Sequence, residues 1–241
     1  NKKQNAFVFI DPYGSKQVRI SAIKSLLKKG NSEVLLFLPT HFMFRFIEGG
    51  TPESLYEFIE EIVPKDEWPK SETGLEFIEN LKYGFKKYLG DSIFVDTFVI
   101  SREKNQFFCL FFFSSHIYGF DRMLDAKWEL DEEQGRGWLF NAGIDDLFSI
   151  IEKEPNTKKF EDELRTFLNS GAKNNKEVYE FTLRNGHLPT HAMQILKKWQ
   201  DNKELVSKTP TGKDGRKSAF YISYREYKSS EPIKLIFTLK I

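Results

Sequence analysis

The feature that most constrains the fold is an unbroken apolar run at residues 6–10 that stops at Asp11-Pro12-Tyr13-Gly14. Apolar side chains without alternation predict a strand buried on both faces, as in a parallel sheet covered by helices. Pro12 cannot donate to a ladder, and Gly14 permits a sharp turn. We therefore expect a strand inside a sheet, with polar residues at its carboxyl end, where open α/β sheets bind ligands. A strand end followed by an ordinary Pro-Gly turn explains the same residues equally well.

The segments that follow alternate between helix and strand. A helix at 18–29 and a second apolar run at 33–39 complete a strand–helix–strand unit, which predicts two parallel strands. Four polar residues join the next two strands, so these should form an antiparallel hairpin. The further expected elements are helices at 51–63, 71–89, 115–130 and 145–152, and strands at 94–101 and 106–113.

This order of elements matches the second half of a Rossmann-like methyltransferase sheet, in which the last strand inserts antiparallel beside its neighbours. No G-x-G-x-x-G turn follows a strand in this sequence. The half that would bind S-adenosylmethionine is therefore expected to be missing. The chain also enters a core-type strand five residues after Asn1, which suggests that upstream sequence has been lost.

Charge and composition indicate two domains. From residue 155 onward, 17 Lys and Arg face 10 Asp and Glu, whereas the preceding part is net acidic. This asymmetry predicts domains at 1–154 and 155–241, the second facing an anionic partner. The single cysteine, Cys109, predicts no disulfide framework, no metal site and a reducing, cytoplasmic setting. No apolar stretch reaches the roughly 18 residues of a spanning helix, so no membrane partner is expected.

From residue 155 the pattern is that of a winged helix-turn-helix domain. Three helices with apolar faces are expected, then two strands joined by a glycine-containing loop that we call the wing. A further strand should follow. The helices are predicted at 157–168, 176–185 and 191–202, the strands at 205–207, 219–223 and 233–241, and the wing at 208–217.

The third of these helices and the wing carry side chains suited to nucleic acid. In a helix-turn-helix, the second helix of the motif enters the major groove of DNA. Gln can read adenine edges, and Lys can contact guanine or phosphate. A protein-interaction winged helix whose charges are merely solvated is the alternative. The candidate residues are Thr190, His191, Gln194, Lys197 and Lys198 in the helix, and Lys208, Lys213, Arg216 and Lys217 in the wing.

Two polar residues of the first domain are candidate substrate contacts. Arg45 lies in the segment after the second strand, where it could reach a ligand; pairing with a surface carboxylate is the alternative. His116 directly follows the last strand, where it could act as a base or touch a partner; a half-buried, satisfied histidine is the alternative.

The residues Asp11, Pro12 and Tyr13 resemble a motif of amino-methyltransferases that act on adenine, Asp/Asn-Pro-Pro-Tyr/Phe at a strand end. The likeness implies that the Asp11 carboxylate and the following carbonyl accept hydrogen bonds from the target amino group. It also implies that Tyr13 stacks on a base flipped out of its helix. Here the second proline is absent and the aromatic residue comes one position earlier.

Several blocks together resemble the three-Cys-motif partner protein family. They are Phe9 to Gly14, Phe42 to Arg45, His116 to Trp128, and, for the winged helix, Asn174 to Leu205. The resemblance implies a methyltransferase-like fold, S-adenosylmethionine as cofactor, and a radical S-adenosylmethionine protein with three cysteines as partner. One hypothesis is thus a methyltransferase-like protein that acts on or binds nucleic acid, with amino-group methylation as the candidate reaction. The other is a non-catalytic scaffold that recognises nucleic acid within a multi-protein system, with defence as a candidate role.

Overall fold

The computed structural model describes residues 5–12, 19–46, 53–62, 70–103, 106–131, 155–228 and 230–240. Tyr13 and the predicted helix at 145–152 lie outside these ranges. The chain divides into two compact units, which we call the sheet unit (Asn1–Phe120 and Trp138–Ser149) and the winged-helix unit (Asp121–Gly137 and Ile150–Ile241). The division passes inside helix α5, Ile117–Leu130, after Phe120.

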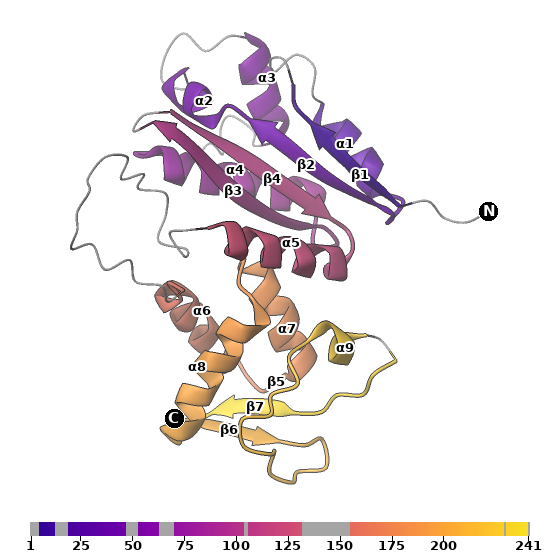
Figure 1. Cartoon of the computed structure of the whole chain (residues 1–241), viewed down its shortest axis with the longest axis vertical. Helices are drawn as coiled ribbons and strands as arrows, with labels where there is room; N and C mark the ends of the chain where they lie inside the picture. The colour runs from indigo at the N-terminus through magenta and orange to yellow at the C-terminus, as the bar shows by residue number, and fades with distance from the viewer. Residues whose placement is uncertain are drawn as a thin grey trace. The chain divides into compact units, whose positions relative to one another are not determined.

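The sheet unit is built on four strands in the order β1-β2-β4-β3 (Figure 1). β1 and β2 are parallel, and β4 lies antiparallel between β2 and β3. The last strand is therefore inserted antiparallel beside its neighbours, as the sequence predicts. The strands are β1 Ala6–Ile10, β2 Ser32–Leu38, β3 Phe94–Glu103 and β4 Gln106–Ser114.

The prediction that the opening strand lies inside the sheet is wrong for the described residues. β1 is an edge strand, and the side chains of Phe7 and Phe9 are 59% and 56% exposed. Only the alternate residues Val8 and Ile10 pack against the core. The apolar run correctly predicts a strand. A run of five residues does not, however, show whether another strand pairs with the free edge of β1.

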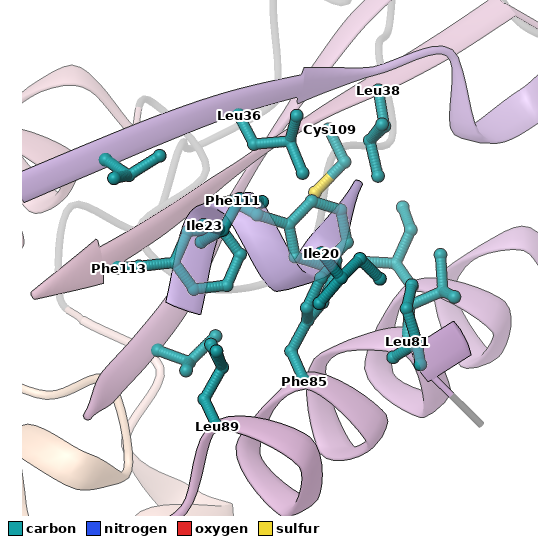
Figure 2. Close-up of a cluster of buried hydrophobic side chains, with 14 of the residues drawn as sticks. Ile20, Ile23, Leu36, Leu38, Leu81, Phe85, Leu89, Cys109, Phe111 and Phe113 are labelled. Carbon is teal, nitrogen blue, oxygen red and sulfur yellow. The ribbon is translucent and has the colours of Figure 1, made fainter. Parts of the chain in front are cut away.

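The core of the sheet unit lies between one face of the sheet and its helices (Figure 2). Phe85 packs its ring against Phe111 and Phe113, with centroids 5.1 and 5.0 Å apart. Cys109 is fully buried among these side chains, so it serves packing. The helices on this face are α1 Ile20–Leu27, α2 Thr40–Phe46, α3 Glu53–Ile62 and α4 Gly74–Leu89. The first turn of α5 packs on the other face, where the ring of Phe120 lies against those of Phe94 and Phe112.

The winged-helix unit contains three helices, α6 Lys158–Asn169, α7 Asn175–Arg184 and α8 Pro189–Asp201, close to where the sequence predicts them. The side chain of Asn174 caps α7 in a reciprocal capping box with Glu177, which fixes the start of that helix. A sheet in the order β5-β7-β6 closes the unit. The remaining elements are β5 Lys173–Asn174, β6 Leu205–Lys208, α9 Tyr224–Tyr227 and β7 Ile236–Leu239.

The strand predicted at 219–223 is wrong. The partner of β6 is β7, in which Ser207 faces Phe237. Ser218 and Tyr221 adopt positive φ angles of 59° and 55°, which an extended strand does not accommodate. The residues after the wing are therefore held in an irregular loop.

Candidate nucleic-acid interface

The candidate catalytic and substrate-binding residues of the sheet unit lie at two different ends of the sheet. Asp11 is exposed at the end of edge strand β1, and Pro12 is half-buried. Arg45 is exposed on helix α2, not in a loop, but it follows β2 and so belongs to the same end of the sheet as Asp11.

His116 lies at the other end of the sheet. It follows β4, whose last residue, Ser114, pairs with Glu33 at the amino end of β2, whereas Leu38 at the carboxyl end pairs with Cys109. Five strand residues at about 3.3 Å each put roughly 17 Å between the two ends. Arg45 and His116, the two candidate substrate contacts, therefore lie at opposite ends of the sheet, because β4 runs antiparallel to β2. Among the residues that the structure describes, no three His, Cys, Asp or Glu side chains are grouped to hold a metal ion.

Helix α8 in the winged-helix unit presents a polar face to solvent. Pro189 begins the helix, and Lys203, with a left-handed φ of 63°, follows its end. Successive residues of an α-helix are rotated by about 100°, so residues three or four positions apart lie on the same side. The apolar side of α8 packs into the core, where Trp199 is fully buried. The exposed residues, which we call the α8 face, are Thr190, Gln194, Lys197, Lys198 and Asp201.

His191 does not belong to this face, so the prediction that it points outward is wrong. Its side chain is 4% exposed and lies edge-on to the ring of Trp128, with centroids 4.5 Å apart. The Leu188 N–H donates to His191 Nδ1 at 3.3 Å. Burial lowers the pKa of His191 to about 4, so the imidazole is neutral at physiological pH. The buried His191 imidazole therefore stabilises the start of α8 by accepting from the Leu188 N–H.

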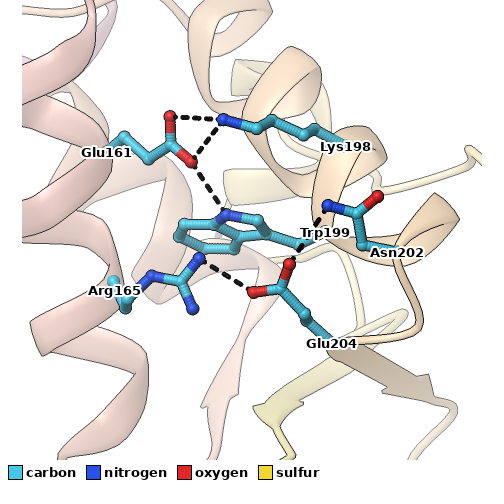
Figure 3. A network of polar contacts seen from close by, with 6 residues as sticks. All are labelled: Glu161, Arg165, Lys198, Trp199, Asn202 and Glu204. Carbon is cyan, nitrogen blue, oxygen red and sulfur yellow. Dashed lines mark hydrogen bonds and ion pairs between the residues drawn. The ribbon is translucent and has the colours of Figure 1, made fainter.

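Helix α6 borders the α8 face on one side (Figure 3). The Glu161 carboxylate accepts from Lys198 Nζ at 3.0 and 3.1 Å, and its Oε1 also accepts from Trp199 Nε1 at 3.0 Å. One turn along α6, the Arg165 guanidinium lies over the Trp199 ring, 4.5 Å from its centroid, and pairs with Glu204 at 2.9 Å. The charge of Lys198 is thus already matched by a carboxylate of the protein.

The wing borders the other side. The Ser218 N–H donates to Gln200 Oε1 at 2.9 Å, and Lys217 Nζ pairs with Asp201 Oδ1 at 2.8 Å. The hydrogen bond from Lys217 lowers the pKa of Asp201, and the charge of Lys197 adds to the effect. These two contacts attach the end of the wing to the carboxyl end of α8. Sequence patterns do not predict the roles of Gln200 and Asp201, because these roles depend on how the loop after the wing folds back onto α8.

The tip of the wing is a tight turn. Thr209 N–H donates to the Lys213 carbonyl at 2.8 Å, and Gly212 adopts a φ of +84° that favours glycine. A bridge between Lys208 and Asp214 continues β6 into this turn. The four basic residues predicted in the wing, Lys208, Lys213, Arg216 and Lys217, are all exposed. With the α8 face they form one polar, mostly basic surface.

Residues 130–212 match the family model of the GMT-like wHTH domain. The match covers the three helices and β6, and it ends inside the wing, before Lys213. Comparisons with curated proteins and with solved structures found no match. None of the helices in the described ranges is long and apolar enough to cross a membrane. The winged helix-turn-helix is thus supported both by the family match and by the order of its elements.

Proposed function

We propose that the winged-helix unit binds double-stranded DNA, with α8 in the major groove and the wing along the phosphates. Thr190, Gln194 and Lys197 would face base edges, and the cations of the wing would face the backbone. A 13-residue helix is roughly 20 Å long and fits the wide major groove of B-DNA. The deep, narrow major groove of an RNA duplex does not admit it.

One observation carries this proposal: the N–H of Ser218, the residue directly after the wing, donates to Gln200 Oε1 of α8 at 2.9 Å and so ties the end of the wing to the helix. The helix that would read bases and the loop that would contact phosphates therefore belong to one preformed surface. Ordering that surface on binding would cost little conformational entropy.

Fluorescence anisotropy with a labelled random-sequence duplex tests the proposal. We expect the logarithm of the association constant to fall linearly with the logarithm of salt concentration. The double variant K213A/R216A should lower the magnitude of this slope by about 2, since each removes one phosphate contact. K159A is the control, because Lys159 is exposed on α6 and pairs with Glu163 one turn along the same helix. A binding constant that is indifferent to salt would instead favour a protein-interaction winged helix.

A second candidate concerns the sheet unit, as an S-adenosylmethionine-dependent methyltransferase whose candidate reaction is amino-group methylation. The parallel β1–β2 pair and the antiparallel insertion of β4 support it. The described residues do not by themselves fit the cofactor, because Asp11 is exposed on an edge strand and no glycine-rich turn is present. Calorimetric titration with S-adenosylmethionine decides the matter, since absence of heat at millimolar cofactor would leave the sheet unit as a scaffold.

The radical S-adenosylmethionine partner is a proposal that rests on the family resemblance alone. Co-purification of this chain with such a protein, when the two are expressed together, is the test. A stable complex that survives gel filtration would support the partnership, and separate elution would count against it.

A further inference from the structure

Two cations at the borders of the α8 face are held by carboxylates of the protein itself. Glu161 of α6 binds Lys198 through both of its oxygens, and Asp201 of α8 binds Lys217 of the wing. Lys198 and Lys217 remain 61% and 71% exposed, so a phosphate could reach either of them. Each carboxylate thus competes with a DNA phosphate for the charge of its lysine.

We infer that Glu161 and Asp201 are specificity-determining residues that weaken binding to DNA of arbitrary sequence. The inference rests on the proposed function, since it assigns a role within that interface. Binding that does not depend on sequence comes almost entirely from phosphate contacts and the counterions they release. A lysine that already has a carboxylate partner must exchange it for the phosphate, and the exchange yields little net free energy.

Glu161 is the stronger of the two competitors. Its side chain is only 22% exposed, and the buried indole of Trp199 donates to it at 3.0 Å. This hydrogen bond fixes the carboxylate, so it cannot swing away when a phosphate approaches. The Arg165 guanidinium of α6 also stacks over the Trp199 ring and pairs with Glu204 (Figure 3). These two contacts add to the attachment of α6 at this position.

The consequence is that base contacts supply a larger share of the binding free energy. A complex on an arbitrary sequence depends on the phosphate contacts, so losing those of Lys198 and Lys217 removes much of its affinity. A complex on the preferred sequence loses the same two contacts but keeps the base contacts of Thr190, Gln194 and Lys197. At physiological salt, binding is then restricted to sequences that supply those base contacts.

The substitution E161Q tests the inference in the full chain. The Gln amide oxygen can still accept from Trp199 Nε1, while the negative charge beside Lys198 is removed. We expect tighter binding to a random-sequence duplex and a salt slope steeper by about 0.9. The ratio of E161Q to wild-type affinity should then fall about 3.5-fold between 50 and 200 mM salt. Adding K198A to E161Q should abolish the gain, whereas K198A alone should leave the wild-type slope unchanged.

The control E163Q removes the same charge from the same helix, where the carboxylate faces Lys159 at 3.7 Å. Equal salt slopes for E161Q and E163Q would overturn the inference while leaving the proposed function intact. Absence of duplex binding by the wild type and by every variant would overturn the proposed function itself. Should thermal melting show that E161Q does not fold, D201N provides an independent test at the border with the wing. The expected change in the salt slope is the same.

Discussion

At the scale of the residue, the histidine inside the helix-turn-helix links pH to stability. Burial holds the pKa of His191 at about 4, below its ordinary value of 6.5. The unfolded chain therefore binds a proton that the folded chain does not, and the free energy of unfolding falls as pH decreases from 6.5 to 4. Above pH 6.5 the full stability is present. Each pKa unit corresponds to about 1.4 kcal/mol, so the loss reaches at most roughly 3 kcal/mol at pH 4.

Urea unfolding followed by tryptophan fluorescence between pH 7 and pH 4 measures this effect. The variant H191N retains an acceptor for the Leu188 N–H but does not titrate, so its stability should depend less steeply on pH across this interval. The variant H116N, which replaces an exposed histidine of the sheet unit, is the control for the substitution itself. A pH profile that H191N leaves unchanged would show that His191 is accessible to solvent protons in the folded state.

At the scale of the element, the strand β1 separates what a sequence pattern can predict from what it cannot. The apolar run predicts a strand correctly, and the four polar residues at 102–105 predict the hairpin of β3 and β4. In the structure the strands extend further than predicted, because β3 ends at Glu103 and β4 begins at Gln106. The position of β1 at the edge of the sheet depends on contacts between distant segments, which local periodicity does not record. The antiparallel β4 places His116 far from Arg45 for the same reason. On α8, periodicity predicts the exposed residues, but not that position 191 turns inward against Trp128.

The edge position of β1 leads to a prediction about stability. Phe9 is more than half exposed, so F9S should lower the free energy of unfolding by less than about 1 kcal/mol. Leu36, in the neighbouring strand β2, is fully buried, and L36A should cost about 2–5 kcal/mol. Chemical denaturation of both variants provides the comparison. A loss of stability for F9S that approaches that of L36A would mean that the face of β1 that carries the Phe9 side chain is covered in the folded protein.

At the scale of the whole molecule, the boundary between the units has a testable consequence. Charge and composition predict a boundary near residue 154, whereas contacts assign Asp121–Gly137 to the winged-helix unit. Within that unit, Trp128 Nε1 donates to the Gly186 carbonyl at 2.8 Å, and Asp121 accepts from the Tyr179 hydroxyl at 2.8 Å. Both contacts join the part of α5 from Asp121 onward to the helix-turn-helix. A pattern read along the sequence cannot detect them, because the two segments of each pair lie 58 positions apart.

A fragment that begins at residue 155 should therefore be less stable than one that begins at residue 116. The shorter fragment lacks Trp128, which is 7% exposed in the chain, and loss of a buried tryptophan costs about 3–5 kcal/mol. For a domain of this size, 3 kcal/mol lowers the melting temperature by at least roughly 12 °C, as circular dichroism would measure. The variant W128F in the longer fragment should give a smaller loss, since phenylalanine keeps part of the packing but not the hydrogen bond. Equal melting temperatures for the two fragments would show that the helix-turn-helix is complete without α5, and that its core begins at α6.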